Sequence, residues 1–297
     1  IHGLVDRPLG LTMEDLTRFP SVTRQHYVEC AGNRSRPSAK NVQETHGLTS
    51  NTEWTGVLLS TLLKESGVQS SGTWIVAEGM EEVKGASSIP IAKAMDDCLV
   101  AYGQIGEPLR PQQGFPLRLM VPGYEGIFQV KYLRRIKVVD RYYWTYNDYG
   151  HRRSEPREAT LATIWGPKSV ITFPSGGQKM SGPGMYEIRG LAWSGQGAVK
   201  GVELSMDGGK SWKPAQLKGP AHRMAHVAFG LQWNWDGKEC ELQSRCTDDQ
   251  GSIQPTMAQV AKYWNEPLTK ETRVKGLDNS IQPWKIERDG RVTDAME

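Results

Sequence analysis

Short hydrophobic runs bounded by glycine and proline alternate with polar stretches through the first half of the chain. Leu58 and Leu62 lie one helical turn apart, and Gly67 follows as a C-terminal cap. Together they predict a helix over residues 56–66. Thr12 predicts the start of a shorter helix, with Asp15 as a partial capping box and Pro20 as the stop. Runs rich in β-branched and aromatic residues predict strands at Trp74–Ala77, Leu99–Tyr102, Leu117–Val121 and Arg135–Val139.

The pattern changes after about residue 159, where short strands separated by turns follow one another. Regular short strands at this spacing suggest an immunoglobulin-like sandwich, and Asp207-Gly208-Gly209 is a hairpin signal within it. A polar linker at Tyr149–Glu158 divides the chain into domains at 1–155 and 156–297. The strands are expected at Val170–Thr172, Met185–Trp193, Gly201–Met206, Ala225–Trp233 and Glu239–Thr247. The core is expected to contain Trp193, Trp212, Trp233 and Trp235.

Composition excludes several classes of protein. The 297 residues are 38% hydrophobic and 23% charged, which is ordinary for a globular protein and excludes collagen, coiled coil and bulk disorder. The 36 Lys and Arg residues nearly balance the 33 Asp and Glu residues, so there is no electrostatic case for nucleic-acid binding. No apolar run approaches the roughly 18 residues that a membrane-spanning helix needs.

The densest group of chemically useful residues surrounds Cys30, in Glu29-Cys30-Ala31-Gly32-Asn33-Arg34-Ser35-Arg36. A thiolate stabilised by arginines is a soft ligand for a transition metal, and Arg34 and Arg36 could hold an anion beside it. A lone cysteine in a loop is more often a small buried residue, so both interpretations stay open. The other three cysteines are Cys98, Cys240 and Cys246. Four cysteines are too few for a disulfide scaffold, and the sequence contains no c-type haem motif.

A second stretch combines glycines with cations: Gln113–Arg118 is followed by Val121–Gly126 and by Gln129-Val130-Lys131. Glycines after a strand let backbone amides approach an anion closely, and Arg118 and Lys131 could neutralise a phosphate. A basic, solvated strand edge explains the same residues equally well. Tyr102 ends a predicted strand, where it is either a hydrogen-bond donor in a cleft or an ordinary aromatic residue.

Taken in order, these segments resemble the sulfite oxidase family of molybdenum enzymes. Cys30–Arg34 is similar to its metal-binding motif, while Ala192–Gly195 and Ser205–Gly209 are similar to its dimerisation domain. Further motifs follow in family order: Glu78-Gly79, Ser88–Pro90, Lys93–Asp96, Ala101-Tyr102, Gly114–Pro116, Val121–Gly123 and Val130-Lys131. The chain most resembles the sulfane dehydrogenase branch, on His46–Leu48, Glu53–Val57, Gly123–Gly126 and Asn279–Gln282.

The resemblance implies an α+β fold, with a molybdopterin-binding domain followed by an immunoglobulin-like dimerisation domain. It implies molybdenum–molybdopterin as the cofactor, Cys30 as the metal ligand, and a family segment upstream of Ile1 that contacts the pterin. Either the sequence is truncated there or the pocket lacks that wall. The implied catalytic residues are Cys30, Arg34, Arg36 and Tyr102. The implied cofactor contacts are Cys30, Glu81, Gln113, Arg118, Gln129, Val130 and Lys131, although the family often has Asp and His in place of Glu81 and Gln113.

The implied activity is the oxidation of sulfane sulfur carried on a protein thiol, with electrons passed to a c-type cytochrome subunit in the periplasm. No haem is expected on this chain. By the resemblance, Ser35 stands where sulfite oxidases typically have an arginine, His46 where they have a lysine, and Ala101 where they often have an acid. Fewer fixed charges favour a protein-bound substrate over doubly charged sulfite. Free sulfite is the alternative substrate, and a dimeric binding protein without metal is the second alternative.

The resemblance also predicts that the second domain forms a symmetric homodimer inside a hetero-oligomer with the cytochrome. Analytical ultracentrifugation of the purified chain at micromolar concentration should therefore give about twice the chain mass of 33.1 kDa. A strictly monomeric species would contradict this prediction.

Overall fold

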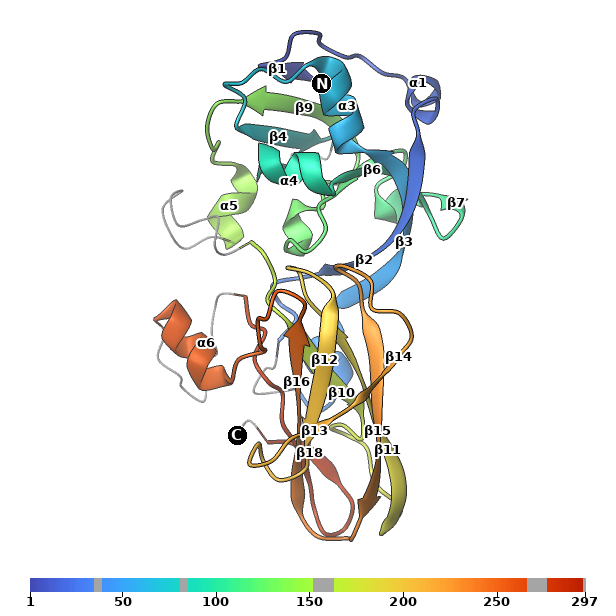
Figure 1. Cartoon of the computed structure of the whole chain (residues 1–297), viewed down its shortest axis with the longest axis vertical. Helices are drawn as coiled ribbons and strands as arrows, with labels where there is room; N and C mark the ends of the chain where they lie inside the picture. The colour runs from blue at the N-terminus through green and yellow to red at the C-terminus, as the bar shows by residue number, and fades with distance from the viewer. Residues whose placement is uncertain (35–38, 81–84, 152–162, 266–276, 296–297) are drawn as a thin grey trace. The chain divides into compact units, whose positions relative to one another are not determined.

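The chain is described by a computed structural model, which covers residues 1–34, 39–80, 85–151, 163–265 and 277–295. Contacts divide it into two compact units (Figure 1). The first unit comprises Ile1–Val28 and Asn51–Thr163, and the second comprises Glu29–Ser50 and Ile164–Glu297. The segment that carries Cys30 therefore groups with the second half of the chain. The predicted boundary at residue 155 lies outside the described residues and stays a prediction.

The first unit is built on two sheets (Figure 1). One has the order β2-β3-β6-β7, with β8 also paired to β6, and the other has the order β1-β9-β4-β5. The strands are β1 (His2–Gly3), β2 (Ser21–Glu29), β3 (Thr49–Leu58), β4 (Trp74–Gly79), β5 (Ala86–Pro90), β6 (Leu99–Gln104), β7 (Glu107–Pro108), β8 (Arg118–Met120) and β9 (Leu133–Val139). Because β2 ends at Glu29 and β3 begins at Thr49, the segment between them is a long excursion from this sheet.

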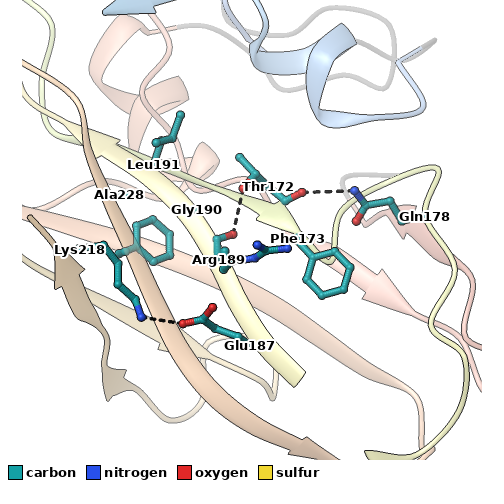
Figure 2. Close-up of a pocket in the computed structure, with 10 residues that line it drawn as sticks. Thr172, Phe173, Gln178, Glu187, Arg189, Gly190, Leu191, Lys218 and Ala228 are labelled. Atoms are coloured by element: carbon teal, nitrogen blue, oxygen red, sulfur yellow. Dashed lines mark hydrogen bonds and ion pairs between the residues drawn. The ribbon is translucent and has the colours of Figure 1, made fainter. Parts of the chain in front are cut away.

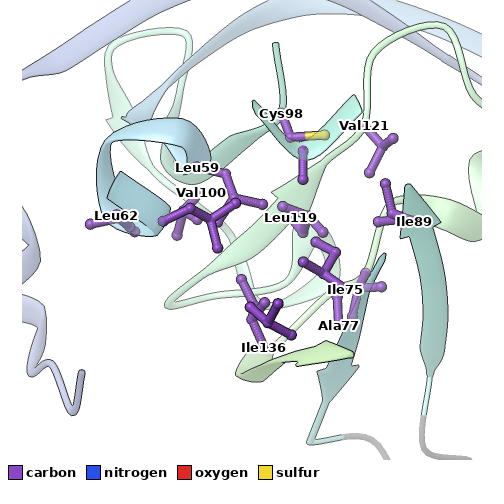
Figure 3. Close-up of a cluster of buried hydrophobic side chains, with 14 of the residues drawn as sticks. Leu59, Leu62, Ile75, Ala77, Ile89, Cys98, Val100, Leu119, Val121 and Ile136 are labelled. Carbon is purple, nitrogen blue, oxygen red and sulfur yellow. The ribbon is translucent and has the colours of Figure 1, made fainter. Parts of the chain in front are cut away.

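Four α-helices accompany these sheets in the described residues: α1 (Met13–Thr17), α3 (Leu59–Ser66), α4 (Ile91–Asp96) and α5 (Tyr146–His151). The predicted cap of α1 is confirmed, since the Thr12 side chain accepts a hydrogen bond from the Asp15 amide. Apolar side chains of α3 and of the strands meet in one core, as Figure 3 shows for Leu59, Leu62, Ile75, Ile89, Val100, Leu119 and Ile136. Burial of this cluster is the main stabilising contribution in the unit.

The predicted helix over residues 56–66 begins later than expected. Gly56 is still a strand residue of β3, paired with Ala101 of β6, and α3 starts at Leu59. A Cβ atom on Gly56 would collide with the backbone of Val100 and Ala101, so glycine here lets two strands approach closely. Gly67 caps α3 in the left-handed region, at φ 66°, as predicted. The strand β2 was not predicted. Its sequence, SVTRQHYVE, is largely polar, and its apolar residues do not alternate regularly with polar ones.

The second unit is a sandwich of two sheets, with the orders β10-β11-β15-β14 and β13-β12-β16-β17-β18 (Figure 1). The strands are β10 (Lys168–Phe173), β11 (Gly184–Trp193), β12 (Val199–Ser205), β13 (Lys213–Pro214), β14 (Gln216–Lys218), β15 (Val227–Trp235), β16 (Cys240–Asp248), β17 (Trp284–Ile286) and β18 (Val292–Asp294). Two helices, α2 (Val42–His46) and α6 (Met257–Trp264), belong to the same unit. In the described part of the chain no helix is both long and apolar enough to span a membrane.

The sandwich confirms most of the pattern predicted for the second half. The hairpin after β12 turns through Gly208 and Gly209, both at positive φ, and leads to β13. Trp193 and Trp235 are buried as predicted, whereas Trp212 and Trp233 are only half-buried. The tryptophans with no exposed surface that the sequence did not indicate are Trp165 and Trp284.

One face of the sheet β10-β11-β15-β14 carries a hollow of about 560 Å³ (Figure 2). Ala228 of β15 is among its lining residues, and the Lys218–Glu187 ion pair of 2.7 Å joins β14 to β11 beside it. None of the site residues predicted from the sequence lines this hollow. A Cβ atom on Gly190, which also lines the hollow, would collide with the Phe229 ring and the Val170 carbonyl oxygen.

Gly190→Ala should therefore destabilise the sandwich by overpacking, by about 1–3 kcal/mol. Gly201→Ala is the matched control, because a Cβ atom on this β12 residue meets no atom within 4 Å. Urea unfolding of both variants measures the difference. Equal unfolding free energies for Gly190→Ala and the unsubstituted chain would show that the close packing at this position is wrong.

Candidate active site

Cys30 stands at the first residue after β2, with its side chain exposed. Its amide donates to the Leu48 carbonyl oxygen at 3.1 Å, and its own carbonyl oxygen accepts from the Asn33 amide at 2.9 Å. The Gly32 amide donates to the Cys30 sulfur at 3.4 Å. The interpretation of Cys30 as a small buried residue is thus wrong.

The residues on either side of Cys30 in the loop, Glu29 and Asn33, have no exposed surface. The Glu29 carboxylate accepts hydrogen bonds from Lys168 Nζ at 2.8 Å, Asn33 Nδ2 at 2.9 Å and Trp193 Nε1 at 2.6 Å. The Asn33 side-chain oxygen accepts from the Leu48 amide at 2.8 Å. An exposed thiol is thus carried on a backbone that is anchored by buried polar groups on both sides.

The other three thiols have environments that suppress their chemistry. Burial raises the pKa of Cys98 and Cys246, the latter to about 12, and the Asp248 carboxylate adds to the effect at Cys246. Burial, and then Asp236, raises the pKa of the half-buried Cys240 to about 11. These thiols stay protonated near neutral pH, which is a poor state for ligating a metal or reacting with an electrophile.

A second group of predicted residues meets in the first unit around Arg118. The Arg118 side chain is 3% exposed and lies over the Trp54 ring at 4.8 Å from its centroid. One of its terminal nitrogens donates to the Gln113 carbonyl oxygen at 3.1 Å, and the other lies 3.4 Å from the Gln129 carbonyl oxygen. Burial lowers the pKa of Arg118 to about 10, so the group remains a cation at neutral pH.

Two features of Arg118 indicate an anion site. Its Nε is buried without a hydrogen-bond partner, and it forms no ion pair with any carboxylate that the structure describes. A buried cation without a counter-charge is unfavourable unless a ligand supplies one. Lys131 bonds to the same loop as Arg118, since its Nζ donates to the Gln112 carbonyl oxygen at 2.7 Å. Gly114, at φ 103°, lets the loop approach Lys131, since a Cβ atom there would lie 2.9 Å from the Lys131 Cβ.

Gln129 organises the neighbouring loop. Its side chain accepts from the Val121 amide at 2.7 Å and donates to the Val121 and Tyr124 carbonyl oxygens at 2.8 and 3.3 Å. Val130 is buried, and its carbonyl oxygen accepts from the Leu119 amide at 2.8 Å. The amide protons of Gln129 are thus already used, and its predicted cofactor contact stays a prediction.

The remaining predicted residues have mixed surroundings. Tyr102 is half-buried in β6 and packs against the core of the first unit, with no hydrogen bond from its hydroxyl to any residue that the structure describes. Arg34 is half-buried in the Cys30 loop. Arg36 and Glu81 lie outside the described residues. The structure thus brings Gln113, Arg118, Gln129, Val130 and Lys131 together in one unit, and Cys30 and Arg34 in the other.

Two contributors were missed from the sequence: Lys168, which binds Glu29, and Trp54, which covers Arg118. Lys168 begins a strand whose first four residues are all buried, so no alternation points to its role. Its partner lies 139 residues away in the chain. Only the tertiary fold pairs such distant positions.

Comparison with known proteins identifies two family domains along the chain. Residues 1–147 match the family model of the oxidoreductase molybdopterin binding domain, and residues 164–267 match that of the Mo-co oxidoreductase dimerisation domain. The crystal structure of the sulfane dehydrogenase SoxCD from Paracoccus pantotrophus is similar over 99% of this chain and 76% of that one. The TM-score is 0.87 and the identity 36%. This chain belongs to the sulfite oxidase family. The α+β fold with a molybdopterin-binding and a dimerisation domain is thereby confirmed.

Relatives in this family extend beyond the length of the chain. The mitochondrial sulfite oxidase of Rattus norvegicus is 32% identical over 289 residues, covering 86% of this chain and 52% of the relative. A nitrate reductase [NAD(P)H] of Hordeum vulgare is 34% identical over 274 residues, covering 79% of this chain and 30% of the relative. The chain thus spans about half the length of the sulfite oxidases that it matches.

The residues present fit the molybdopterin group that characterises this family. A molybdenum ligand is needed, and Cys30 offers an exposed sulfur on an anchored loop. A phosphate site is needed, and Arg118 offers a buried cation with an unpartnered Nε. No cluster of three or more His, Cys, Asp or Glu side chains suited to a metal occurs among the described residues. A single thiolate acting with a pterin ligand does not require such a cluster.

One thiol of the folded chain should react much faster than the rest. At pH 8, iodoacetamide should label Cys30 at least about tenfold faster than the other cysteines, because the raised pKa of those thiols keeps them protonated. Peptide mapping of the labelled protein measures this, and labelling of all four cysteines in urea is the control. Labelling of Cys240 as fast as Cys30 would contradict the assignment.

Proposed function

We propose that this chain is a molybdenum-dependent oxidoreductase that oxidises sulfane sulfur carried on a protein thiol. The observation that carries the proposal is the exposed thiol of Cys30, held in the Cys-Ala-Gly-Asn-Arg sequence of the family by buried neighbours on both sides. The unpaired cation Arg118 in the other unit supports it, because a bound phosphate would complete its surroundings.

The residues of the chain have distinct tasks in this proposal. Cys30 would hold molybdenum, while Arg118 and Lys131 would bind the pterin phosphate with Gln113, Gln129 and Val130. When bound, the cofactor supplies oxygen-atom transfer and accepts two electrons. Tyr102 would donate a hydrogen bond to substrate through its hydroxyl, and Arg34 would attract an anionic sulfur group. Arg36 and Glu81 keep the roles implied by the resemblance.

Charge in the Cys30 loop supports sulfane sulfur over sulfite as the substrate. Burial, and then the nearby Lys168 ammonium, hold the pKa of His46 well below its usual range. His46 is therefore neutral at pH 7, at a position where the resemblance to sulfite oxidases implies a lysine. A doubly charged anion would gain no attraction from a neutral His46, whereas a sulfur group delivered by a carrier protein needs fewer fixed charges.

The electron count calls for an external acceptor, and the resemblance suggests which partners supply it. Each oxygen atom transferred from water to sulfur releases two electrons, and an external acceptor would remove them one at a time. A c-type cytochrome subunit is the proposed acceptor and a thiol-bearing carrier protein the proposed substrate, both in the periplasm. The similarity to the sulfane dehydrogenase SoxCD supports a complex of more than one subunit. The match of residues 164–267 to a dimerisation domain supports a homodimer of this chain within it.

The proposal predicts the phenotype of Cys30→Ser. The purified chain from a host that makes molybdopterin should contain about one molybdenum per chain and reduce cytochrome c with a persulfide-bearing protein. Cys30→Ser should lose this activity and most of its molybdenum, because the serine hydroxyl is a poorer ligand than a thiolate. The circular dichroism spectrum should not change. Cys240→Ser is the matched control and should keep both metal and activity.

The alternatives give different results in the same assay. Oxidation of free sulfite in preference to the protein-bound persulfide would identify a sulfite dehydrogenase. A folded dimer that takes up no molybdenum would identify a binding protein that has lost the metal. Full activity of Cys30→Ser, or electron transfer to a nicotinamide at a rate comparable to cytochrome c, would overturn the proposal.

A further inference from the structure

The Cys30 loop depends on one ammonium group. Lys168, the first residue of β10, has no exposed surface. Its Nζ donates to the Glu29 carboxylate at 2.8 Å, to the Asn33 carbonyl oxygen at 2.6 Å and to the Asp278 carbonyl oxygen at 2.9 Å. All three N–H groups are thus used. Two of the three bonds go to residues on opposite sides of Cys30 in the sequence.

The Glu29 carboxylate completes the arrangement from the other side. It accepts from Lys168, from the Asn33 side chain and from Trp193 at the end of β11. Asn33 is therefore held twice, through its carbonyl oxygen by Lys168 and through its amide by Glu29. The backbone from 29 to 33 has little freedom to rotate while both bonds exist, and Cys30 lies inside this span.

Stability alone does not explain an ion pair at this position. A buried ion pair is usually no more stable than a well-packed apolar pair of the same volume, because each charge loses its hydration. What the pair adds is geometry, since charges and directed hydrogen bonds define one arrangement where apolar contacts allow several. A metal ligand is the kind of residue that needs a single arrangement.

We propose that Lys168 and Glu29 are positioning residues that hold the Cys30 sulfur in the orientation required to ligate molybdenum. The proposal rests on the proposed function for the identity of the metal. It assigns to the dimerisation half of the chain a direct part in building the metal site, since Lys168 and Trp193 come from β10 and β11.

The test compares Lys168→Met with the double variant E29Q/K168M in the full chain. Lys168→Met leaves the Glu29 carboxylate buried without a counter-charge, so its unfolding temperature should fall. E29Q/K168M contains no unpaired charge, so most of the lost unfolding temperature should return. The bonds from Lys168 to Asn33 and Asp278 are absent in both. A positioning role therefore predicts that the loop stays loose in both variants.

Two measurements report on the loop. Hydrogen exchange of the Cys30, Asn33 and Leu48 amides, measured on the cofactor-free chain, should be about tenfold or more faster in both variants. Molybdenum content after loading should fall below half of the unsubstituted value in both. Lys93→Met is the matched control, because Lys93 forms the 2.6 Å ion pair with the buried Asp97 in the first unit. It should lower the unfolding temperature without changing exchange in the loop.

The outcomes separate this proposal from the proposed function. If E29Q/K168M regains its unfolding temperature together with unsubstituted exchange and molybdenum content, the pair serves stability alone and the proposal is overturned. Equal acceleration of loop exchange by Lys93→Met would also overturn it, because general destabilisation would then suffice. If the unsubstituted chain takes up no molybdenum, the proposed function fails, and the exchange measurement still decides whether the pair fixes the loop.

Discussion

The buried ion pair between Glu29 and Lys168 is the interaction on which the candidate metal-ligand loop depends. Both side chains have no exposed surface, and an unpaired charge in such a place is strongly destabilising. The structure satisfies them by giving each three hydrogen bonds, and two of those bonds fix Asn33. The constraint continues along the chain, because Asn33 in turn accepts from the Leu48 amide. An exposed Cys30 sulfur is the outcome of this burial on both sides.

Arg118 shows the opposite use of a buried charge. Its guanidinium is almost as buried as the Lys168 ammonium, yet its hydrogen bonds go to neutral oxygen atoms and its Nε has no partner. Burial lowers its pKa to about 10, because the charged form loses its hydration. A fully satisfied buried charge orders the protein, whereas an unsatisfied one favours an anionic ligand. Lys168 in the second unit and Arg118 in the first illustrate these two cases.

The compact units do not coincide with the segments that the family models cover. The molybdopterin-binding model spans residues 1–147, but residues 29–50 pack with the sandwich. One reason is Gly176, which lies in the turn after β10. The absence of a Cβ atom there lets the Lys40 carbonyl oxygen approach closely. Another is α2, which packs against β10. A substitution in β10 or β11 can therefore act on the Cys30 loop without any change in the loop itself.

The sequence by itself determined the elements whose cause is local. The Thr12 cap, the Gly67 cap and the hairpin at Gly208 and Gly209 follow from side-chain and backbone preferences within a few residues. The ordered motifs around Cys30 and Lys131 were enough to identify the family.

Tertiary structure alone decided which of the candidate site residues face solvent and which charged side chains are buried in ion pairs. The pairing of Glu29 with Lys168 spans 139 residues, and neither residue differs in sequence from an ordinary surface charge. The start of α3 at Leu59 was likewise decided by the neighbouring strand β6, which holds Gly56 in β3. The physical reason is the same in each case. Burial and pairing energies depend on groups that are distant in sequence, and the local pattern of residues does not identify those groups.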